Sequence, residues 1–324
     1  MLVTVTGGSG YIGAVTCAEL AEAGHEVRCL DSLLHGQRGI FDELQERGVE
    51  LIEADVRDED ARGQAVEAAD AVVHLAAIVG DPACAHDPER SREVNVDASR
   101  ALIADAAGAG VERFVFASTC SNYGRMADPT VPIDETAPLA PVSLYAEQKV
   151  EVERLLLEGR QTGGLKPTCL RFATIYGVAP RMRFDLTVNE FTRELWAERE
   201  LEVYGEYFWR PYVHVADAAR AIRTVLEKPA DEVAEDVFNV GRTDENYRKL
   251  DLVELIVERL GRGDVSFVSR DEDPRDYKVD FSKIKDRLGF EPALTVPDGI
   301  DEIVRGLEAK QFDDPFDRSF SNVG

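Results

Sequence analysis

Residues 2–13, with the sequence LVTVTGGSGYIG, join a strand-like run to a glycine-rich turn that opens an amphipathic segment. The glycines of this G-x-x-G-x-x-G pattern are Gly7, Gly10 and Gly13. Glycines at such positions allow a tight turn and a close backbone approach to a pyrophosphate, and the N-terminus of the following helix attracts the anion. The stretch therefore predicts a dinucleotide-binding turn, in which Tyr11 and Ile12 begin the helix.

A carboxylate stands where the second predicted strand ends. Asp31 closes the run Val27–Asp31, 18 residues after Gly13. A carboxylate at this place accepts hydrogen bonds from the adenosine ribose and repels a 2′-phosphate, so NAD is favoured over NADP. Arg28 and Arg38 are near Asp31 in sequence and keep the phosphorylated cofactor open as an alternative.

Apolar runs rich in β-branched residues alternate with helix-like segments along the first half of the chain. The strand-like runs are Leu2–Thr6, Val27–Asp31, Leu51–Asp55, Ala71–Ala76, Arg113–Ser118 and Thr168–Ile175. The helix-like segments are Ile12–Ala23, Asp58–Ala69, Pro88–Gly108 and Leu144–Gly159. Strands that are apolar on both faces and joined through helices predict a parallel sheet with right-handed crossovers. We expect a doubly wound α/β fold of the Rossmann type.

The pattern changes after residue 175. The later segments are a helix over Thr187–Glu200, short runs at Leu201–Tyr204 and Arg210–Val215, a possible returning strand at Val237–Val240, and helices at Leu250–Leu260 and Ile284–Leu288. We expect a cofactor domain over residues 1–175 with returns near 207–244, and a smaller, interleaved substrate lobe over residues 176–206 and 245–324. The tail from Asp313 lacks apolar periodicity and is expected to be mobile.

Composition excludes several classes of protein. The chain has 37 Lys and Arg against 62 Asp and Glu, a formal charge of −25 that repels phosphate backbones and anionic lipids. No apolar run approaches the roughly 20 residues that span a bilayer, and no basic leader precedes Leu2, so we expect a cytoplasmic protein without nucleic acid or membrane partners. The five cysteines form no C-x-x-C pair and the histidines have no zinc spacing, so no metal is expected.

Residues that end the third and fourth predicted strands each allow two interpretations. Asp55 either caps the helix that begins near Asp58 or meets the adenine amino group. Leu75, Ala76 and Ala77 either pack closely against a helix or let the cofactor lie against the backbone.

A phenol and an ammonium are placed one helical turn apart in the segment YAEQK, as Tyr145 and Lys149. A phenol has an ordinary pKa near 10, so it acts as a base at neutral pH only when a cation stabilises the phenolate. Lys149 is the only lysine among the first 165 residues, which indicates that this position requires an ammonium. Ser118 and Thr119 end the fifth strand, where ligands of open α/β sheets gather; they either contact a reacting carbinol or satisfy loop amides.

Taken together, the motifs resemble those of the extended short-chain dehydrogenase/reductase family, in its branch of nucleotide-sugar epimerases and dehydratases. The resemblance covers nearly the whole chain. It rests on TGGSGYIG, HLAA at 74–77, NVDAS with Asn95, STCSNYG, YAEQK, LRFATIYG, RPYVHV at 210–215 and FNVG at 238–241.

The resemblance implies roles for individual residues. Tyr145 would be the catalytic acid/base, Lys149 would hold the nicotinamide ribose and lower the Tyr145 pKa, and Thr119 would contact the sugar carbinol. It places in the NAD site Gly7, Gly10, Tyr11, Ile12, Gly13, Asp31, Ser32, Asp55, Val56, Leu75, Ala76, Ala77, Asn95, Ser118, Tyr145, Lys149 and Phe172. It places in the substrate site Thr119, Cys120, Thr174, Asp185, Leu186, Tyr204, Arg210 and Arg275. Surface ion pairing remains an alternative for the two arginines, and a core position for Tyr204.

Departures from the family pattern narrow the expected reaction. In the 4,6-dehydratase branch an Asp-Glu pair follows the threonine, and here Cys120 and Ser121 occupy those places, which disfavours dehydration. The absence of that glutamate also disfavours the decarboxylases of the family. Pro211 stands where relatives commonly carry aspartate.

We therefore expect an NAD-dependent nucleotide-sugar epimerase that inverts C4 of a UDP-hexose through a transient 4-keto sugar. The alternative is a nucleotide-sugar 4-ketoreductase or dehydrogenase that uses the same residues. A non-catalytic NAD-binding regulator is disfavoured because Thr119, Tyr145 and Lys149 are intact. The resemblance also implies a homodimer formed through Pro88–Gly108 and Leu144–Gly159.

Overall fold

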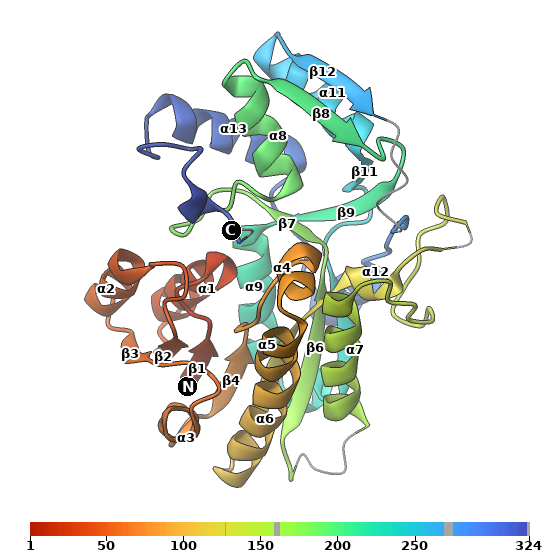
Figure 1. Ribbon diagram of the computed structural model, residues 1–324. Helices are drawn as coiled ribbons and strands as arrows, with labels where there is room; N and C mark the ends of the chain where they lie inside the picture. Colours follow the sequence, from red (N-terminus) through yellow and green to blue (C-terminus); the bar gives the residue numbers. More distant parts are fainter. Residues whose placement is uncertain (127, 159–162, 269–274, 323–324) are drawn as a thin grey trace.

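The computed structural model describes residues 1–126, 128–158, 163–268 and 275–322 (Figure 1). Its main sheet has seven parallel strands in the order β10-β6-β5-β4-β1-β2-β3. These are β1 (Leu2–Thr6), β2 (Glu26–Asp31), β3 (Glu50–Glu53), β4 (Ala71–His74), β5 (Arg113–Thr119), β6 (Lys166–Phe172) and β10 (Asp236–Val240). The strand order reverses between β1 and β4, which is where doubly wound folds bind their ligands. The predicted α/β fold is confirmed.

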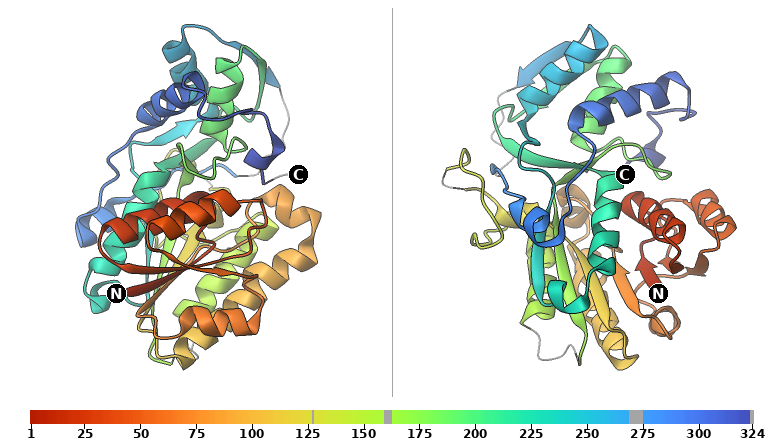
Figure 2. Two further views of the ribbon diagram at one scale, coloured as in Figure 1. Left: turned by 90° about the vertical axis from the view of Figure 1, so that its left-hand side faces the viewer. Right: turned by 180° about the vertical axis from the view of Figure 1, so that it is seen from behind.

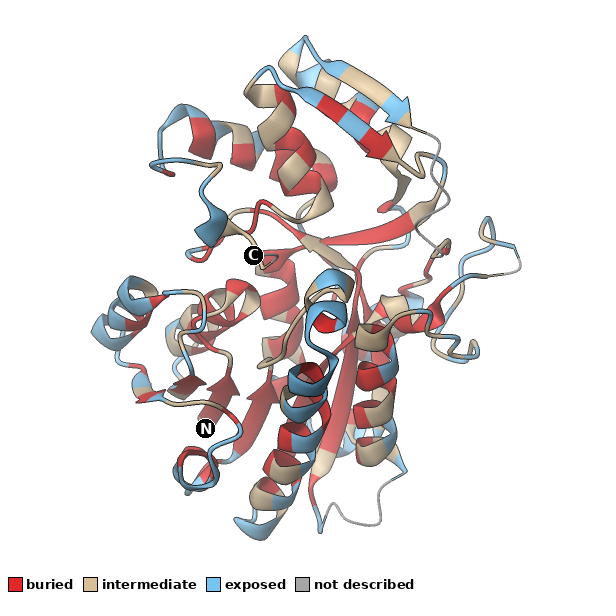
Figure 3. Cartoon of the chain, in the orientation of Figure 1, coloured by how far each residue is buried: buried red, intermediate tan, exposed pale blue. Residues whose placement is uncertain are grey.

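Helices cover both faces of this sheet, and Figure 3 shows its strands buried along most of their length. The apolar core on one face joins the strands to α1 (Tyr11–Glu22), α2 (Arg38–Glu46), α9 (Val215–Glu227) and α12 (Ser282–Leu288). The core on the other face joins them to α3 (Glu59–Val66), α6 (Ala98–Gly108) and α7 (Leu144–Leu157).

The predicted helix over Pro88–Gly108 is a continuous helical path with a change of pitch inside it. It consists of α5 (Pro88–Arg92), a π-helical turn over Glu93–Asp97, and α6. Another short helix, α4 (Asp81–His86), precedes it. Such π turns often occur beside functional sites. The end of the helix predicted over Leu144–Gly159 falls on Gly159, which lies outside the described residues.

The chain leaves the main sheet at Ala173, so the predicted strand Thr168–Ile175 is two strands. Ala173 donates its backbone N–H to Val240 O, and β7 (Thr174–Tyr176) then pairs with β9 (Trp209–His214). The strands of the smaller lobe are β7, β8 (Glu200–Tyr204), β9, β11 (Asn246–Arg248) and β12 (Asp264–Val268), and its helices are α8 (Thr187–Trp196), α11 (Lys249–Leu260) and α13 (Val296–Glu308). These strands form the sheet β11-β9-β7 and the pair β12-β8 (Figure 2). The short helix α10 (Ala230–Val233) precedes β10.

The prediction of a mobile tail is wrong for residues 313–322. Phe184 donates its backbone N–H to Phe320 O at 2.8 Å, and the Phe320 ring packs edge-on against Phe184 and Phe312. A few aromatic residues thus anchor the tail, although its apolar residues follow no helical or strand period. A prediction from periodicity could therefore not indicate these contacts. Residues 323 and 324 lie outside the described part.

All five cysteines are free and buried, as expected for small apolar side chains. Within the described ranges, no helix combines the length and apolarity that a bilayer crossing requires. The same residues place no three His, Cys, Asp or Glu side chains together as metal ligands.

Candidate active site

A cavity of ≈ 330 Å³ opens at the carboxyl ends of the main strands and is closed above by segments of the smaller lobe. Most of the residues singled out from the sequence line it. They are Gly7, Gly10, Tyr11, Ile12, Gly13, Asp31, Ser32, Asp55, Val56, Leu75, Ala76, Ala77, Ser118, Thr119, Tyr145, Lys149, Phe172, Thr174, Leu186 and Arg275. Residues as far apart in sequence as Gly7 and Arg275 therefore line one cavity.

The glycine turn forms the floor of the cavity. Gly7 has a φ of +71°, and a Cβ there would lie 2.8 Å from the backbone nitrogen of Ala76. A Cβ on Gly13 would overlap the Gly7 carbonyl oxygen. The helix α1 begins next, and no side chain caps its N-terminus, so the N–H groups of its first turn are available to an anion. This cradle fits the pyrophosphate of a dinucleotide.

Gly13→Ala is expected to weaken NAD binding by at least roughly tenfold, because the added methyl group displaces the Gly7 carbonyl and the turn with it. A matched control is Gly63→Ala in α3, where a Cβ has no atom within 4 Å. The control is expected to raise the free energy of unfolding by about 0.5–1 kcal/mol and to leave NAD binding unchanged. Calorimetric titration with NAD tests both, and unaltered affinity in Gly13→Ala would contradict the assigned role of the turn.

Asp31 lies at the end of β2 with both carboxylate oxygens in use. Ser9 and Leu33 donate their backbone N–H groups to it at 2.9 and 2.8 Å. Burial raises the pKa of Asp31, and these donors partly offset the effect. Arg28 forms an ion pair with Glu50, and Arg38 forms one with Glu53. The two cations that left NADP as an alternative cofactor are therefore already neutralised.

The two interpretations of Asp55 are separated in part. Asp58 caps α3 by accepting from Ala61 N, so the helix-cap interpretation of Asp55 is wrong. Asp55 instead pairs with Arg57, and this guanidinium holds the pKa of the carboxyl below its usual range. Its side chain lines the cavity beside Val56.

Asn95 lies in the π turn and does not line the cavity. Its amide accepts a hydrogen bond from Ile78 N at 2.8 Å and donates to Ile78 O at 2.9 Å and to Gln148. The Asn95 side chain thus holds the segment after β4 in place through these hydrogen bonds. Residues Leu75–Val79 of that segment do line the cavity. The structure gives Asn95 an indirect place in the predicted cofactor site.

Tyr145 and Lys149 extend from the first turns of α7, whose N-terminus is capped by Ser143. The Lys149 Nζ atom lies 5.7 Å from the centre of the Tyr145 ring, 4.7 Å from that of Phe116, and donates to Ala117 O at 2.8 Å. Burial raises the pKa of Tyr145 and lowers that of Lys149 to about 8. The phenol is therefore protonated in the free protein, and the lysine is a buried cation at neutral pH.

A buried cation costs stability, which predicts a pH-dependent effect of Lys149→Met. The folded-state pKa of Lys149, about 8, is below its ordinary 10.5, so the penalty is full below pH 8 and absent above about 10.5. Lys149→Met is expected to raise the free energy of unfolding by roughly 1–3 kcal/mol at pH 7 and by much less at pH 10. Urea denaturation of the nucleotide-free wild type and variant at both pH values measures the difference in the free energy of unfolding. An equal difference at pH 7 and pH 10 would contradict the assignment of Lys149 as a destabilising buried cation.

The segment after β5 turns Thr119 toward the cavity and Cys120 away from it. Thr119 Oγ1 accepts from Ser121 N at 3.1 Å as the cap of a short 3₁₀ helix over Cys120–Tyr123, so its own proton is available to a ligand. Cys120 is buried, donates to Arg171 O, and has a pKa raised by burial, which makes it a neutral thiol. Of the pair that replaces the dehydratase carboxylates, only Ser121 lines the cavity.

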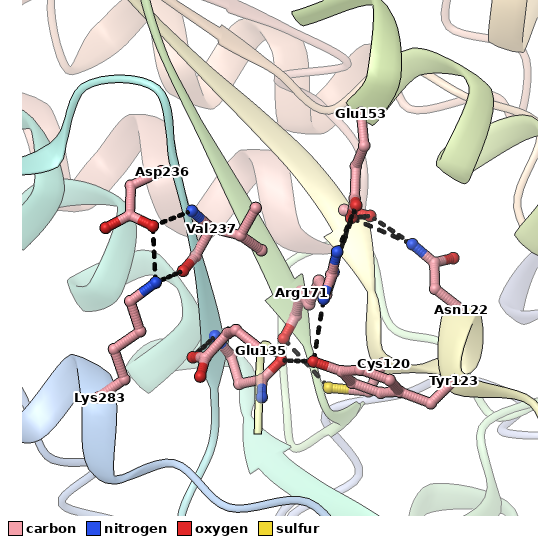
Figure 4. Close-up of polar contacts among 11 residues, drawn as sticks. Cys120, Asn122, Tyr123, Glu135, Glu153, Arg171, Asp236, Val237 and Lys283 are labelled. Carbon is pink, nitrogen blue, oxygen red and sulfur yellow. Dashed lines mark hydrogen bonds and ion pairs between the residues drawn. The ribbon is translucent and has the colours of Figure 1, made fainter. Parts of the chain in front are cut away.

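A buried ion pair holds this segment in place (Figure 4). Glu153 of α7 binds Arg171 of β6 at 2.7 Å, and the two side chains are 2% and 5% exposed. Glu153 also accepts from Ser118 Oγ and from Asn122 Nδ2. Arg171 in turn donates to Tyr123 OH. The pair therefore ties α7, which carries Tyr145 and Lys149, to the segment that carries Thr119, and nothing in the sequence marked it.

Four residues assigned to the substrate site do not line the cavity. Cys120 is buried behind it, and Asp185 is paired with Arg183. Tyr204 donates to Glu202 at the end of β8, and Arg210 stacks on Tyr277, which itself lines the cavity. Arg275 lines the cavity and pairs with Asp81 at 3.1 Å.

Several lining residues were missed from the sequence. They include His35, Gln37, Arg90, Arg181, Arg183, Tyr277 and Asn322. The first three lie in loops or on a helix of the main domain, and the others come from the smaller lobe. The segment PRMR at 180–183 has two arginines within three positions, a local signal that could have marked it as an anion site.

Comparison with known proteins decides the family. The model of the NAD dependent epimerase/dehydratase family matches residues 3–241, a span that includes the glycine turn, Tyr145 and Lys149. This chain belongs to that family. Family membership confirms the resemblance drawn from the motifs, the NAD cofactor and the expectation of an enzyme.

Members with different reactions are similar to this chain. A UDP-glucose 4-epimerase of Rhizobium leguminosarum bv. trifolii is 31% identical over 94% of this chain and 95% of its own length. A dTDP-glucose 4,6-dehydratase of Streptomyces niveus is 30% identical over 94% and 92%. The solved UDP-glucose 4-epimerase of Thermus thermophilus in complex with NAD superposes with a TM-score of 0.83 at 28% identity, over 95% of this chain and 99% of that one. The reaction of this family member must therefore be argued from its site.

Proposed function

We propose that this enzyme is an NAD-dependent UDP-hexose 4-epimerase. The observation that carries the proposal is the distribution of acids in the cavity. Among the described lining residues the carboxylates are those of Asp31 and Asp55, both at the ends of β2 and β3, away from Tyr145. Elimination of water needs an acid and a base at the sugar, whereas hydride transfer needs only the phenol, the ammonium and a hydroxyl.

The residues have distinct roles in this reaction. Tyr145 first releases its own proton to solvent; its phenolate then takes the proton of the C4 hydroxyl as the C4–H bond breaks, and returns a proton when the other face is reduced. Lys149 stabilises the phenolate, and Thr119 donates its free hydroxyl hydrogen to the C4 oxygen. When bound, NAD supplies the hydride acceptor and then the donor. Between the two transfers the 4-keto sugar turns its opposite face toward the cofactor, so the net redox change is zero.

The substrate class follows from the upper wall of the cavity and from the relatives. Arg275 and Tyr277 lie on the smaller lobe side, where a guanidinium suits the diphosphate and a ring suits the base. Thr174 and Leu186 line the same cavity as these residues and Tyr145. The similar epimerases of Rhizobium and Thermus are named for UDP-glucose, which supports a UDP-hexose here.

The test is to offer UDP-glucose and UDP-galactose to the protein purified without added cofactor, with chromatography of the products and absorbance at 340 nm in one sample. Interconversion without net NADH is the expected result. Stoichiometric NADH, or inertness until a 4-keto sugar and NADH are supplied, would instead assign a dehydrogenase or 4-ketoreductase. A 4-keto-6-deoxy product would assign a dehydratase.

We also propose a homodimer through α6 and α7, which pack against each other on one face of the sheet. Arg92 of α5, which begins the predicted contact segment Pro88–Gly108, and Arg100 of α6 both pair with Glu151 of α7 on the exposed side of these helices. Light scattering at working concentration is expected to give twice the chain mass of 35.8 kDa. A monomeric mass would reject the dimer.

A further inference from the structure

Arg181 is a buried cation that makes no ion pair in the described part of the chain, although Asp31 and Asp185 act on its charge from farther away. Its residue is 6% exposed, and neither Nε nor Nη2 has a hydrogen-bond partner in the described part of the chain. Neighbouring Arg183 differs, because it forms a two-point ion pair with Asp185 at 3.0 and 2.7 Å. An unpaired buried charge is expensive, so a side chain kept in this state indicates an anion that binds there. Arg181 lines the cavity.

The segment that carries Arg181 is fixed above the glycine turn. Tyr11, the first residue of α1, donates its hydroxyl to Gly177 O at 2.6 Å. Asn189 of α8 accepts from Gly177 N at 2.9 Å and donates to Arg183 O at 2.8 Å. The segment is thus hydrogen-bonded on both sides of Arg181, at Gly177 and at Arg183. The bond from Tyr11 to Gly177 comes from α1, the helix whose N-terminus faces the cavity.

The charge of Arg181 acts at the adenosine end of the cavity. Burial, together with the charges of Arg181 and Arg183, lowers the pKa of His35 to about 4. Arg181 also opposes the rise in the pKa of Asp31 that burial causes. Both residues end β2 or follow it, on the side away from Tyr145. Asn322 lines the same cavity with a buried Oδ1 that has no described partner.

We propose that Arg181 binds the pyrophosphate of the dinucleotide from the side opposite the glycine turn. The proposal rests on the NAD-dependent function above and deepens it. Backbone N–H groups of α1 and the guanidinium of Arg181 would then enclose the pyrophosphate from two lobes. Enclosure by charge from both sides slows cofactor release, and an epimerase needs a cofactor that stays bound between its two hydride transfers.

The decisive variant is Arg181→Met, which removes the charge and keeps an unbranched, apolar stem. Calorimetric titration of the nucleotide-free full chain with ADP-ribose is expected to show a loss of affinity of roughly ten- to a hundredfold, with adenosine binding unchanged. The thermal midpoint of the nucleotide-free variant is expected to equal or exceed that of the wild type, because an unpaired buried charge is gone. Arg262→Ala, an exposed arginine paired with Glu198, is the charge-matched control and is expected to alter neither quantity.

Other ligands distinguish the alternatives. Equal ADP-ribose affinity in Arg181→Met would overturn the proposal. A loss of affinity for UDP alone would also overturn it, because Arg181 would then bind the diphosphate of the substrate. A loss of affinity for NADP alone would overturn it as well, because Arg181 would then bind a 2′-phosphate. A loss for ADP-ribose in a protein that does not interconvert UDP-hexoses would uphold the pyrophosphate subsite while rejecting the epimerase reaction.

Discussion

Tyr145→Phe is expected to lower kcat for UDP-hexose interconversion by about 10² to 10⁴-fold while NAD binding stays within about twofold of wild type. The change removes one oxygen atom from a side chain that lines the cavity beside Lys149. A positioned acid/base contributes rate enhancement of this size. Because the ring is kept, the packing of α7 against the main sheet is expected to be unaffected.

The control for this prediction is Tyr207→Phe. Tyr207 is 63% exposed and lies outside the cavity, so the same chemical change there is expected to leave kcat unaltered. Substantial turnover by Tyr145→Phe would reject Tyr145 as the acid/base. Loss of NAD binding together with turnover would show instead that the hydroxyl serves the fold of the site. Single-turnover measurements with bound NAD separate the chemical step from binding.

Arg171→Met alone is expected to destabilise the protein by roughly 3–5 kcal/mol, the usual cost of leaving a buried charge without its partner. The charge left behind is that of Glu153, which is 2% exposed. Glu153→Gln removes it and keeps an oxygen that can accept from Ser118 and Asn122. The double variant Arg171→Met with Glu153→Gln is therefore expected to be more stable than Arg171→Met.

Urea denaturation of the wild type, both single variants and the double variant gives the coupling energy between these residues. We expect a coupling of about 2 kcal/mol or more. Additive effects would contradict the assignment of the pair as a mutually neutralising unit. In Arg171→Met, kcat is expected to fall as well, because the unpaired Glu153 disturbs both the segment that carries Thr119 and the helix that carries Lys149.

Local patterns were enough to predict many of the residues that line the cavity, at the end we assign to the cofactor. The glycine turn, Asp31 and the Tyr145–Lys149 pair depend on contacts within one strand, turn or helix, so spacing alone indicates them. The alternation of buried strands and helices likewise predicts a parallel sheet, because each strand must be apolar on both faces.

Long-range contacts account for what the sequence did not indicate. Glu153 and Arg171 look like ordinary charged residues until α7 and β6 bring them together. The tail looks unstructured because Phe320 is anchored by Phe184 and Phe312 and not by its own periodicity. Arg181 also differs from the many paired arginines only in its surroundings: among the described residues its Nε and Nη2 atoms have no hydrogen-bond partner, which a sequence does not display.

The central claim is that C4 is oxidised and then reduced before the sugar dissociates from the site, and that the same cofactor molecule returns the hydride. UDP-glucose carrying deuterium at C4 tests this most directly, in a reaction without added NAD. The account predicts that UDP-galactose forms with its C4 deuterium fully retained, and that no deuterated NADH appears in solution. Loss of the label from C4, or release of deuterated NADH in proportion to product, would contradict it.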